Sequence, residues 1–526
     1  MLNFLSSLYP ISLFLMVAVF ATWYTFDLKG IRHRLFGYAK ITSASIFLLS
    51  FFVSYKLEWA TLLWLARDIS IFVVLMSLYE TFLKYKLITS TVVLTISSGI
   101  GFNMYQAGNL NFHSASSSFS ANKGAELLIN IKNTDQLAEL QSLLKPFDAS
   151  FAEAFPHLQS KGITDLDECY TIDLKDASQQ TKLIEALRSS GLVDWVEENE
   201  TIKLKPNKSE KVSSAKKNWK HLNDPLLTNV WEFNYLEINE LSASLRKLKP
   251  KKKASIYILD TGVDGNHEDL NANYISLDKK YDSDTDIHGT HCAGIASAVS
   301  NNKLGIASLN FENKFTTITG ITVLPNGSGT QEAIIDGIIL AADNGADVIS
   351  MSLGGRSNDK RQRAYNKAIE YANKKGAIVV VAAGNEAQNA TKSVPASCKN
   401  VITVSAVGNE LQMADFSNFV NDIEYKVAAP GVGILSTVPN NKYESLDGTS
   451  MATPYVAGII GILKSLSPEL TTAEVYKILS ETGIDTNETK LTGKFIQPNK
   501  ALNKLDLSSS IWDWIWKVLF NFNPLK

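Results

Sequence analysis

Residues 223–504 are predicted to form an α/β fold in which helices cover both faces of a mostly parallel sheet. Apolar runs of strand length alternate there with amphipathic stretches of helical length, such as 331–345 and 362–376. Strands buried on both faces appear as continuous apolar runs, and their alternation with helices favours parallel pairing. The apolar runs are 254–260, 314–323, 346–353, 377–385 and 400–408.

A smaller α+β domain is predicted for residues 124–204. Two helical stretches, 135–144 and 179–190, are interleaved with strand-like runs in the same segment. The order β-α-β-β-α-β is that of a ferredoxin-like, split β-α-β domain. The strand-like runs are 126–132, 168–174 and 192–204.

Residues 1–107 are predicted to be a transmembrane region of about four helices, because a spanning helix needs roughly 20 mostly apolar residues. No Lys or Arg precedes Lys29, so the charged start of a cleavable signal peptide is missing. The third stretch carries Arg67 and Asp68, which are costly in lipid. A model with three spans and one interfacial helix therefore stays open. The apolar stretches are 5–26, 41–55, 60–82 and 87–105.

The loops between these stretches predict the orientation. Lys and Arg residues concentrate in the first and third loops, which favours a cytoplasmic position for both. With four spans, the long segment after residue 105 is then extracytoplasmic, whereas three spans would place it inside. The charges concerned are Lys29, Arg32, Arg34 and Lys40 in the first loop and Lys84 and Lys86 in the third.

Three further segments complete the predicted organisation. Residues 108–123 form a serine-rich linker, residues 205–222 a lysine-rich connector, and residues 505–526 an aromatic, amphipathic tail. The apolar part of the tail is too short to span, so it lies in a membrane interface or docks on its own domain. The net charge of −2 gives no general attraction to nucleic acid. Three scattered cysteines do not make a disulfide framework, although one bridge stays open.

Three polar residues at glycine-marked turns are the candidates for chemistry. Asp260 ends an apolar strand in ILDTGVD, His288 opens a helix in HGTHCAG, and Ser450 lies just inside a helix in LDGTSMATP. Each has an ordinary structural explanation when taken alone: a turn aspartate, a surface or capping histidine, and a helix-capping serine. Together they supply a nucleophile, a base and the acid that orients the base. His291 could join His288 in a metal site, but no third ligand is evident.

The same chemistry needs a donor for the oxyanion that forms when a hydroxyl attacks a carbonyl. Asn385 ends the apolar run VAAGN and is the candidate, with the backbone N–H of Ser450 as the second donor.

These motifs resemble the subtilisin family of serine proteases over about 280 residues. The quoted blocks are DTGVDGNHEDL, HGTHCAGI, SMSLGG, AAGNE, VPASCKNVITVSAV and AAPGVGILSTVPNNKYESLDGTSMATPYVAG. The resemblance implies a subtilisin-like fold and an Asp260–His288–Ser450 triad with Asn385 in the oxyanion hole. It also implies that Ser352, Leu353 and Gly354 pair with the backbone of an extended substrate.

The resemblance carries further expectations. Residues 124–204 are similar to the family's propeptide, which inhibits by placing its C-terminal strand in the cleft. Cys292 resembles the thiol of proteinase-K-like members, but a role as a buried small apolar residue is the preferred explanation. No cofactor is needed for the chemistry. Structural calcium is common in the family, and 300–307 resembles one such loop without a ligand set that can be assigned.

The sequence thus predicts a membrane-anchored serine endopeptidase, autoprocessed, that acts on protein or peptide substrates. Its other predicted partners are the lipid bilayer and its own propeptide-like domain. The alternative from another class is a catalytically silent membrane scaffold or peptide-binding protein. A second alternative is a cytoplasmic protease on three spans.

Overall fold

The computed structural model describes residues 125–204, 207–209, 219, 222–356 and 362–505. They belong to one compact unit, Phe119–Lys526. The predicted transmembrane region, the serine-rich linker, most of the lysine-rich connector and the aromatic tail lie outside the described residues. Within the described ranges, none of the helices has both the length and the apolar character needed to cross a bilayer.

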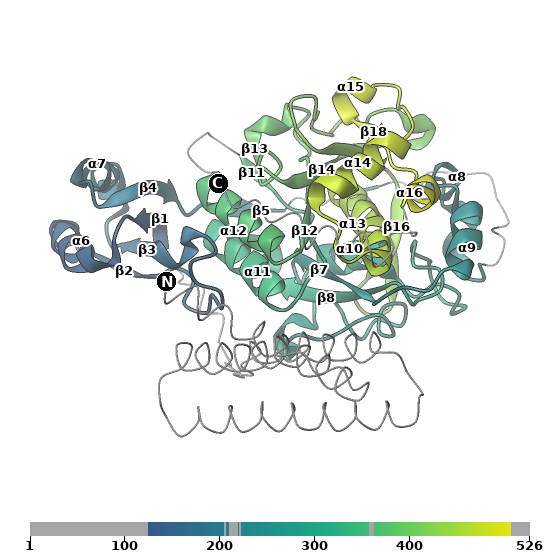
Figure 1. The fold of residues 1–526 in the computed structure, drawn as a ribbon, viewed down its shortest axis with the longest axis horizontal. Helices are drawn as coiled ribbons and strands as arrows, with labels where there is room; N and C mark the ends of the chain where they lie inside the picture. Colours follow the sequence, from purple (N-terminus) through teal and green to yellow (C-terminus); the bar gives the residue numbers. More distant parts are fainter. Residues whose placement is uncertain (1–124, 205–206, 210–218, 220–221, 357–361, 506–526) are drawn as a thin grey trace, which may run out of the picture. The chain divides into compact units, whose positions relative to one another are not determined.

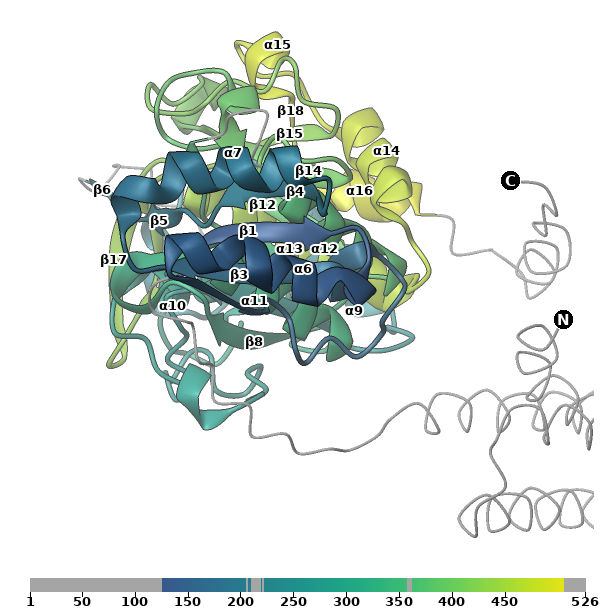
Figure 2. The ribbon, with the colours of Figure 1, turned by 90° about the vertical axis from the view of Figure 1, so that its left-hand side faces the viewer.

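Residues 125–198 form a four-stranded antiparallel sheet with two helices on one face (Figures 1 and 2). The strand order is β2-β3-β1-β4, and leucines of both helices pack on the sheet in one apolar cluster. The elements are β1 (Ala125–Ile131), α6 (Leu137–Leu144), β2 (Ala149–Glu153), β3 (Cys169–Leu174), α7 (Gln180–Ser190) and β4 (Val193–Glu198). Strand β2 was in none of the predicted apolar runs because its sequence, ASFAE, is largely small and polar.

The single strand predicted over 192–204 is wrong, because the structure divides it into two strands that belong to different sheets. β4 stays in the small sheet, whereas β5 (Thr201–Lys203) pairs antiparallel with β9 (Ser328–Thr330). Asn199, between the two strands, donates from Nδ2 to Glu332 of the larger domain. This contact with the other domain fixes the point at which the chain leaves the small sheet.

The larger domain is built on seven described strands, all paired in parallel, in the order β18-β15-β14-β12-β10-β7-β8. This confirms the α/β class and the mostly parallel sheet. Every predicted apolar run contains one strand. The strands are β7 (Ala254–Asp260), β8 (Thr316–Thr322), β10 (Val348–Met351), β12 (Ile378–Ala382), β14 (Val401–Val407), β15 (Lys426–Pro430) and β18 (Lys494–Phe495).

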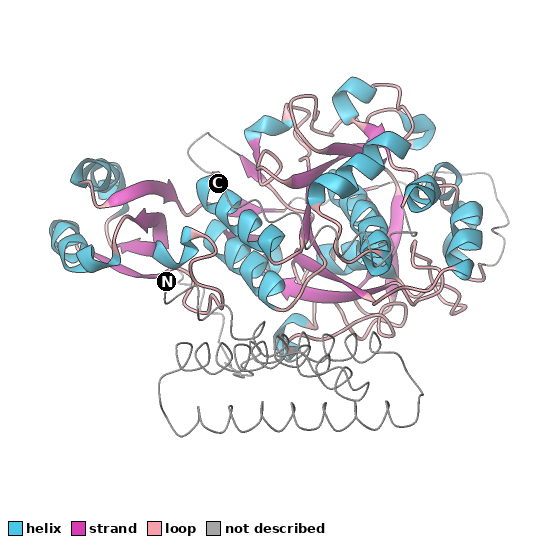
Figure 3. Ribbon diagram, viewed as in Figure 1, coloured by secondary structure: helices cyan, strands magenta, loops and turns pink. Residues whose placement is uncertain are grey.

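Helices cover both faces of this sheet (Figure 3). Alternate residues of a strand point to opposite faces, so Ile256 and Ile258 of β7 enter one apolar cluster and Tyr257 and Leu259 enter the other. Helices α10 (His288–Ser297) and α13 (Thr449–Leu466) contribute to the first cluster. Helices α11 (Gln331–Asp343) and α12 (Arg363–Lys374) contribute to the second.

The remaining elements are short and surround the central layers. The helices are α8 (Glu232–Tyr235), α9 (Ile238–Lys247), α14 (Thr472–Thr482), α15 (Thr489–Thr492) and α16 (Pro498–Lys504). The strands are β6 (Asn207–Lys208), β11 (Gly355–Arg356), β13 (Ser393–Val394), β16 (Ile434–Val438) and β17 (Lys442–Asp447). β11 pairs with β13, and β17 lies between β16 and β6.

Candidate functional site

The candidate catalytic residues meet where the strands of the large sheet end. Asp260 is the last residue of β7, His288 the first of α10, and Ser450 the second of α13. Glycine is required beside the histidine, because a Cβ on Gly289 would lie 2.0 Å from the carbonyl oxygen of Gly262. This close approach brings the start of α10 against the loop that follows β7.

Asp260 and His288 form a buried hydrogen-bonded pair. The Nδ1 atom of His288 lies 2.8 Å from Oδ1 of Asp260, which also accepts the Thr261 N–H at 2.8 Å. The side chains of His288 and Asp260 are 3% and 0% exposed, so solvent screens the pair little. Burial favours the neutral imidazole, but the adjacent Asp260 carboxylate and, after it, Cys292 together outweigh burial and raise the pKa of His288 well above its ordinary value. A ring held in this way can accept a proton at its other nitrogen.

Asp284 ties the loop after β7 to the start of α10 and was missed by the sequence analysis. Its Oδ2 accepts from the N–H and hydroxyl of Thr290, and its Oδ1 accepts from the Thr261 hydroxyl at 2.8 Å. The Thr261 hydroxyl in turn accepts the N–H of Gly289 at 2.9 Å. No local signal distinguishes it, because Asp282 and Asp286 stand in the same run. Asp284 therefore positions the catalytic pair without touching it.

Ser450 lines the same cavity, and its described hydrogen bonds go to Ser352 rather than to the imidazole. Its hydroxyl donates to the carbonyl oxygen of Ser352 at 3.1 Å, and the Ser352 hydroxyl donates back to the Ser450 carbonyl at 2.8 Å. Among the described hydrogen bonds none joins the Ser450 hydroxyl to His288. The hydroxyl has to turn from Ser352 toward the ring before it can lose its proton, and such tightening on substrate binding is common.

Asn385 is oriented toward the cavity by the start of α13. Its Oδ1 accepts two hydrogen bonds from Thr449, one from the N–H and one from the hydroxyl, each at 2.9 Å. Since both bonds use the amide oxygen, the amide nitrogen is the group available to an anion. Gly384 N donates to the same Thr449 hydroxyl at 3.2 Å, which fixes the threonine as well. Thr449 was not singled out from the sequence.

A cavity of about 460 Å³ joins these groups. His288, Asn385 and Ser450 line it together with Ser352, Leu353 and Gly354, the predicted substrate-binding residues. Ser352 and Leu353 are buried, whereas Gly354 is exposed and presents its backbone. All seven residues predicted for the site are thus close to one cavity, with Asp260 behind His288.

Strand β5 lines the same cavity through Thr201, Ile202 and Lys203, and its partner strand, β9, was not predicted from the sequence. β9 pairs with β5, and Ile202 of β5 is 5% exposed, whereas its neighbours Thr201 and Lys203 are exposed. A Cβ on Gly355 would lie 3.1 Å from Cγ1 of Ile202, so β5 packs closely on this glycine. The small domain therefore inserts one apolar side chain beside the catalytic residues. The Gly-Ser-Gly of 327–329 was the available signal.

Two other residues of the histidine motif, Cys292 and His291, are buried and make contacts within the fold. Sγ of Cys292 lies 3.9 Å from Nδ1 of His288 and 3.5 Å from the Ser450 carbonyl, and burial raises its thiol pKa. His291 directs Nε2 to the carbonyls of Ile434 and Glu444, and burial lowers its pKa to about 3. It is a neutral donor to β16 and β17, so the His288–His291 metal site is wrong.

Cys169, Cys292 and Cys398 are free, which excludes the bridge left open by the sequence.

The loop 300–307, which resembles a calcium loop, has the carboxylates of Asp224 and Asp269 beside it. Asp269 accepts hydrogen bonds from Ile306 N and the Asn302 side chain, and Asp224 accepts from Asn301 N and Asn302 N. Among the described residues these carboxylates do not form a cluster of three acidic, histidine or cysteine ligands. They are arranged here as hydrogen-bond acceptors, and calcium binding stays a prediction.

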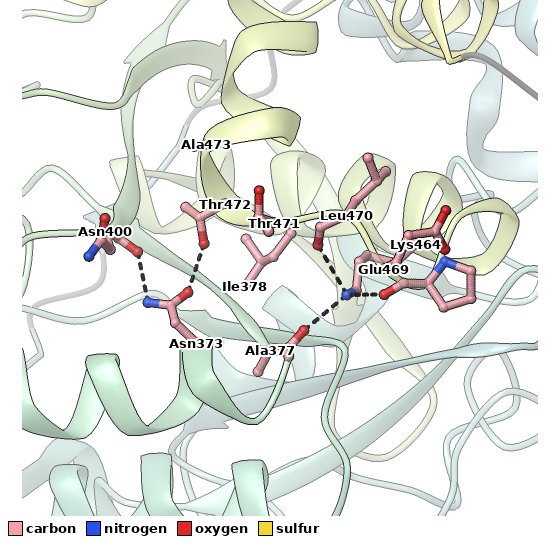
Figure 4. A pocket seen from close by; sticks show the side chains of 12 residues that line it. Asn373, Ala377, Ile378, Asn400, Lys464, Glu469, Leu470, Thr471, Thr472 and Ala473 are labelled. Atoms are coloured by element: carbon pink, nitrogen blue, oxygen red, sulfur yellow. Dashed lines mark hydrogen bonds between the residues drawn. The ribbon is translucent and has the colours of Figure 1, made fainter. Parts of the chain in front are cut away.

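A second cavity, of about 290 Å³, lies before the starts of β12 and β14, at the opposite ends of the strands (Figure 4). Its lysine, Lys464, donates to the carbonyls of Gly376, Pro468 and Leu470. An ammonium has three donors, and all are used here by the protein. The ammonium of Lys464 therefore has a structural role in this cavity.

The sequence model of the family described as "Subtilase family" matches residues 251–502. Thermitase of Thermoactinomyces vulgaris is 44% identical over 218 residues, which are 40% of this chain and 75% of thermitase. The chain belongs to the subtilase family. Subtilisin DY of Bacillus licheniformis, another subtilase, is 39% identical over 45% of this chain and 86% of its own length.

The similarity concerns the peptidase domain, and the extent of each match differs. The chain covers 52% of a thermophilic serine proteinase of Bacillus sp. (strain AK1), at 44% identity. The crystal structure of fervidolysin from Fervidobacterium pennivorans matches with a TM-score of 0.59 at 23% identity, over 72% of this chain and 61% of fervidolysin. That likeness supports the fold. As a subtilase, the chain is a serine endopeptidase that needs no cofactor for catalysis.

Proposed function

We propose that this subtilase is a membrane-anchored endopeptidase that cleaves peptide bonds through an acyl-enzyme. The observation that carries the catalytic part is the buried 2.8 Å pair of His288 and Asp260 at the cavity that Ser450 also lines. In this proposal the Ser450 hydroxyl attacks the scissile carbonyl carbon and His288 takes its proton. Asp260 fixes the tautomer of the ring and stabilises its charged form.

The oxyanion and the substrate backbone have candidate partners in the same cavity. Asn385 would donate from Nδ2 to the oxyanion, because its Oδ1 is held by Thr449. The exposed backbone at Gly354 would pair with one edge of an extended peptide. His288 then returns its proton to the leaving nitrogen, and water hydrolyses the Ser450 ester by the reverse sequence.

We further propose that residues 124–204 form a ferredoxin-like, propeptide-like inhibitor domain. Its sheet order β2-β3-β1-β4, its two helices on one face and the pairing of β5 with β9 support this role. Glu197 accepts hydrogen bonds from Gln331 and from the N–H of Arg363, near the starts of α11 and α12. Anions are favoured at helix N-termini, so the contact matches charge as well as shape.

The membrane anchor and the extracytoplasmic position rest on the sequence of residues 1–107. The apolar stretches and the loop charges support four spans, with the peptidase domain outside the cytoplasm. A compartment-sensitive reporter fused after residue 110 tests this topology. A cytoplasmic signal would favour three spans and a cytoplasmic protease.

The catalytic proposal is tested by labelling with a fluorophosphonate probe. Wild-type protein, treated briefly with trypsin to remove the small domain, should be labelled, and Ser450→Ala should not. Equal labelling of both forms, or of neither, would contradict the assignment and favour a silent scaffold. N-terminal sequencing of both proteins tests autoprocessing, because a common first residue means that Ser450 does not cut its own chain.

A further inference from the structure

The segment that joins α9 to β7 is a run of exposed cations. Its sequence, RKLKPKKK, covers residues 246–253, and all six of its Arg and Lys side chains are exposed. Its two other residues, Leu248 and Pro250, are partly buried. Leu248 packs against the apolar cluster that contains α10 and α13. This basic run therefore presents its charges to solvent and its apolar side chains to the domain.

The main chain of the basic run is fixed to the fold. The N–H groups of Lys251 and Lys252 both donate to the carbonyl of Ser465, near the end of α13, at 2.8 and 3.3 Å. The run then continues directly into β7, where Ala254 N donates to the carbonyl of Phe315 at 2.8 Å. These bonds hold the run against the domain, so its cations form a fixed surface rather than a free linker.

Most of these charges are not neutralised within the domain. Arg246 pairs with Glu312 at 3.2 Å, and Lys252 pairs with Asp347 at 2.7 Å. The other four cations of the run form no ion pair with a described residue: Lys247, Lys249, Lys251 and Lys253.

Two exposed acids border the basic run, Glu240 on α9 and Glu469 in the loop after α13. Glu240 is seven residues before Lys247, about 10 Å along the helix axis. Four unpaired lysines therefore outnumber the acids around them, and the surface keeps an excess of positive charge.

The end of the described chain lies beside this surface. α16, the last described helix, packs against α9, and Ser244 Oγ of α9 donates to Oδ1 of Asn499 in α16 at 2.8 Å (Figure 1). The sequence continues beyond α16 with IWDWIWKVLFNF, residues 511–522. Trp and Phe are favoured at membrane interfaces, and a weak apolar contact combined with a basic surface gives stable attachment.

These observations favour an anionic lipid surface over a nucleic acid as the partner. Clusters of about 4–8 Lys and Arg residues beside a membrane attachment bind anionic phospholipids. Nucleic acid is less favoured because the basic run has no aromatic side chain on which a base could stack, and because the net charge of the chain is −2.

We propose that residues 246–253 bind an anionic phospholipid surface and orient the peptidase domain on it. The run precedes the first residue of β7, whereas Asp260 of the catalytic site is the last of its seven residues. At about 3.3 Å per residue, roughly 20 Å of strand separates the two. The catalytic cavity is then on the side of the domain away from the bilayer. The inference rests on the proposed membrane location and deepens it, because this contact remains when the connector to residues 1–107 is cut.

The experiment measures how close two sides of the domain lie to a bilayer. Full-length Ser450→Ala protein, which cannot cut itself under the proposed mechanism, is reconstituted in vesicles of phosphatidylcholine alone or mixed with phosphatidylglycerol. Energy transfer from a fluorescent donor on the protein to an acceptor lipid reports the distance. A single added cysteine takes the donor selectively, because the three native cysteines are buried.

Two exposed positions carry the donor in separate variants. Ala243→Cys lies on α9, one turn before Lys247 and on the same face of the helix. Thr391→Cys lies next to β13, which pairs with β11 beyond the carboxyl end of β10. In mixed vesicles, we expect at least twofold more transfer from residue 243 than from residue 391.

The excess transfer should depend on charge. It should disappear without phosphatidylglycerol and at about 1 M salt, where the screening length is about 3 Å. It should also disappear in the variant Lys247→Ser/Lys249→Ser/Lys251→Ser/Lys253→Ser. The matched control removes the same charge from exposed lysines elsewhere and should leave the excess unchanged. This control is Lys182→Ser/Lys279→Ser/Lys392→Ser/Lys442→Ser.

Other outcomes would overturn the inference while the proposed anchor stands. These are equal transfer from the two positions, or transfer from residue 243 that phosphatidylglycerol, salt and the four changes in the run leave unaltered. A donor at residue 243 that responds to an added oligonucleotide but not to phosphatidylglycerol would assign the run to a nucleic acid instead. If the chain floats only with vesicles that contain phosphatidylglycerol, the proposed anchor fails and this inference stands. If it floats with neither kind of vesicle, both fail.

Discussion

Asn199 and Glu332 exchange two hydrogen bonds across the contact between the small domain and helix α11. The Asn199 amide donates to Oε2 of Glu332 at 3.2 Å, and the Glu332 N–H donates to Oδ1 of Asn199 at 3.0 Å. Burial is the main cause that raises the pKa of Glu332 to about 7, and nearby Asp336 adds to it. The docked domain therefore favours the protonated carboxyl of Glu332.

This relationship predicts that docking of the small domain weakens as pH rises. Glu332 regains an ordinary pKa near 4.5 when uncovered, so the docked form takes up a proton between that value and 7. The cost of burying the charge is absent below pH 4.5 and complete above 7. Glu332→Gln keeps an acceptor for Asn199 without the charge. It should slow amide exchange over β4 and β5 at pH 8 about fivefold or more. One pKa unit corresponds to about 1.4 kcal/mol, or a factor of ten, so this effect is only a modest part of the shift of Glu332.

Other titratable groups at this contact act in the same direction. Asp336 hydrogen-bonds His157 at 3.1 Å and raises the pKa of the imidazole. The contribution of this pair to docking is therefore fully present below the ordinary pKa of histidine and is lost as pH rises through the raised pKa. Burial also raises the pKa of Glu197. A residual pH dependence is therefore expected in Glu332→Gln. Glu469→Gln, at an exposed position before α14, is the control, and an unchanged slope in Glu332→Gln would contradict the prediction.

Ile202 should determine how well β5 closes the cleft. Its side chain is buried against Gly355, whereas the adjacent Lys203 side chain is exposed. Ile202→Asp would bury a charge without a partner, which costs several kcal/mol. We expect at least tenfold faster hydrolysis of a small chromogenic peptide by the full chain, and no change for Lys203→Asp. Equal rates for the two variants would mean that β5 does not limit access.

Asn385→Leu should lower kcat with little effect on KM, because an oxyanion donor acts mainly in the transition state. Removal of the oxyanion asparagine of subtilisin lowers kcat about 10²–10³-fold, and we expect a loss of the same size here. Thr449→Val removes one of the two bonds that orient the amide, and a smaller loss of kcat is expected. Steady-state kinetics on the trypsin-treated enzyme measure both. A change confined to KM would mean that the residue binds substrate in the ground state instead.

Asp260→Asn should change both the rate and its pH dependence. The Asp260 carboxylate raises the pKa of His288 against the effect of burial. Because the base must be neutral, wild-type kcat/KM should rise as pH passes upward through that raised value. In the variant the inflection should move to lower pH, and kcat should fall by about 10⁴, a magnitude carried over from the same Asp→Asn change in the chymotrypsin-type triad. An unmoved inflection would assign it to another group.

The site residues could be predicted because each lies at the end of a regular element and carries chemistry in its type. Asp260 ends an apolar strand and His288 begins a helix. The apolar run and the glycine-marked turns in the sequence were therefore enough to locate both residues. The partners that orient them were not predicted. Asp284 and Thr449 act through hydrogen bonds to residues elsewhere in the chain, and local sequence gives no sign of that.

The strands show the same division between local and long-range information. Each apolar run became a strand of the large sheet because burial on both faces demands continuous apolar sequence. Strand β2 was missed because its side chains are mostly exposed, and β5 was merged with β4 because its partner, β9, lies more than a hundred residues away. The pairing of β6 with β17 could not be inferred from a two-residue strand.

Lys464 should matter for stability and not for catalysis. The ammonium is buried and bridges the carbonyls of Gly376, Pro468 and Leu470, which joins the end of α13 to the loops before β12 and α14 (Figure 4). Lys464→Met fills a similar volume but leaves buried acceptors without donors, which should cost about 3 kcal/mol. Lys477→Met, on the exposed face of α14, should cost less than about 0.5 kcal/mol. Denaturant unfolding of the two variants measures the difference. The lysine lies at the amino ends of the strands, whereas the catalytic residues lie at their carboxyl ends. The kcat/KM of the folded Lys464→Met enzyme should therefore equal that of wild type. A loss of activity without a loss of stability would show instead that this cavity is coupled to the active site.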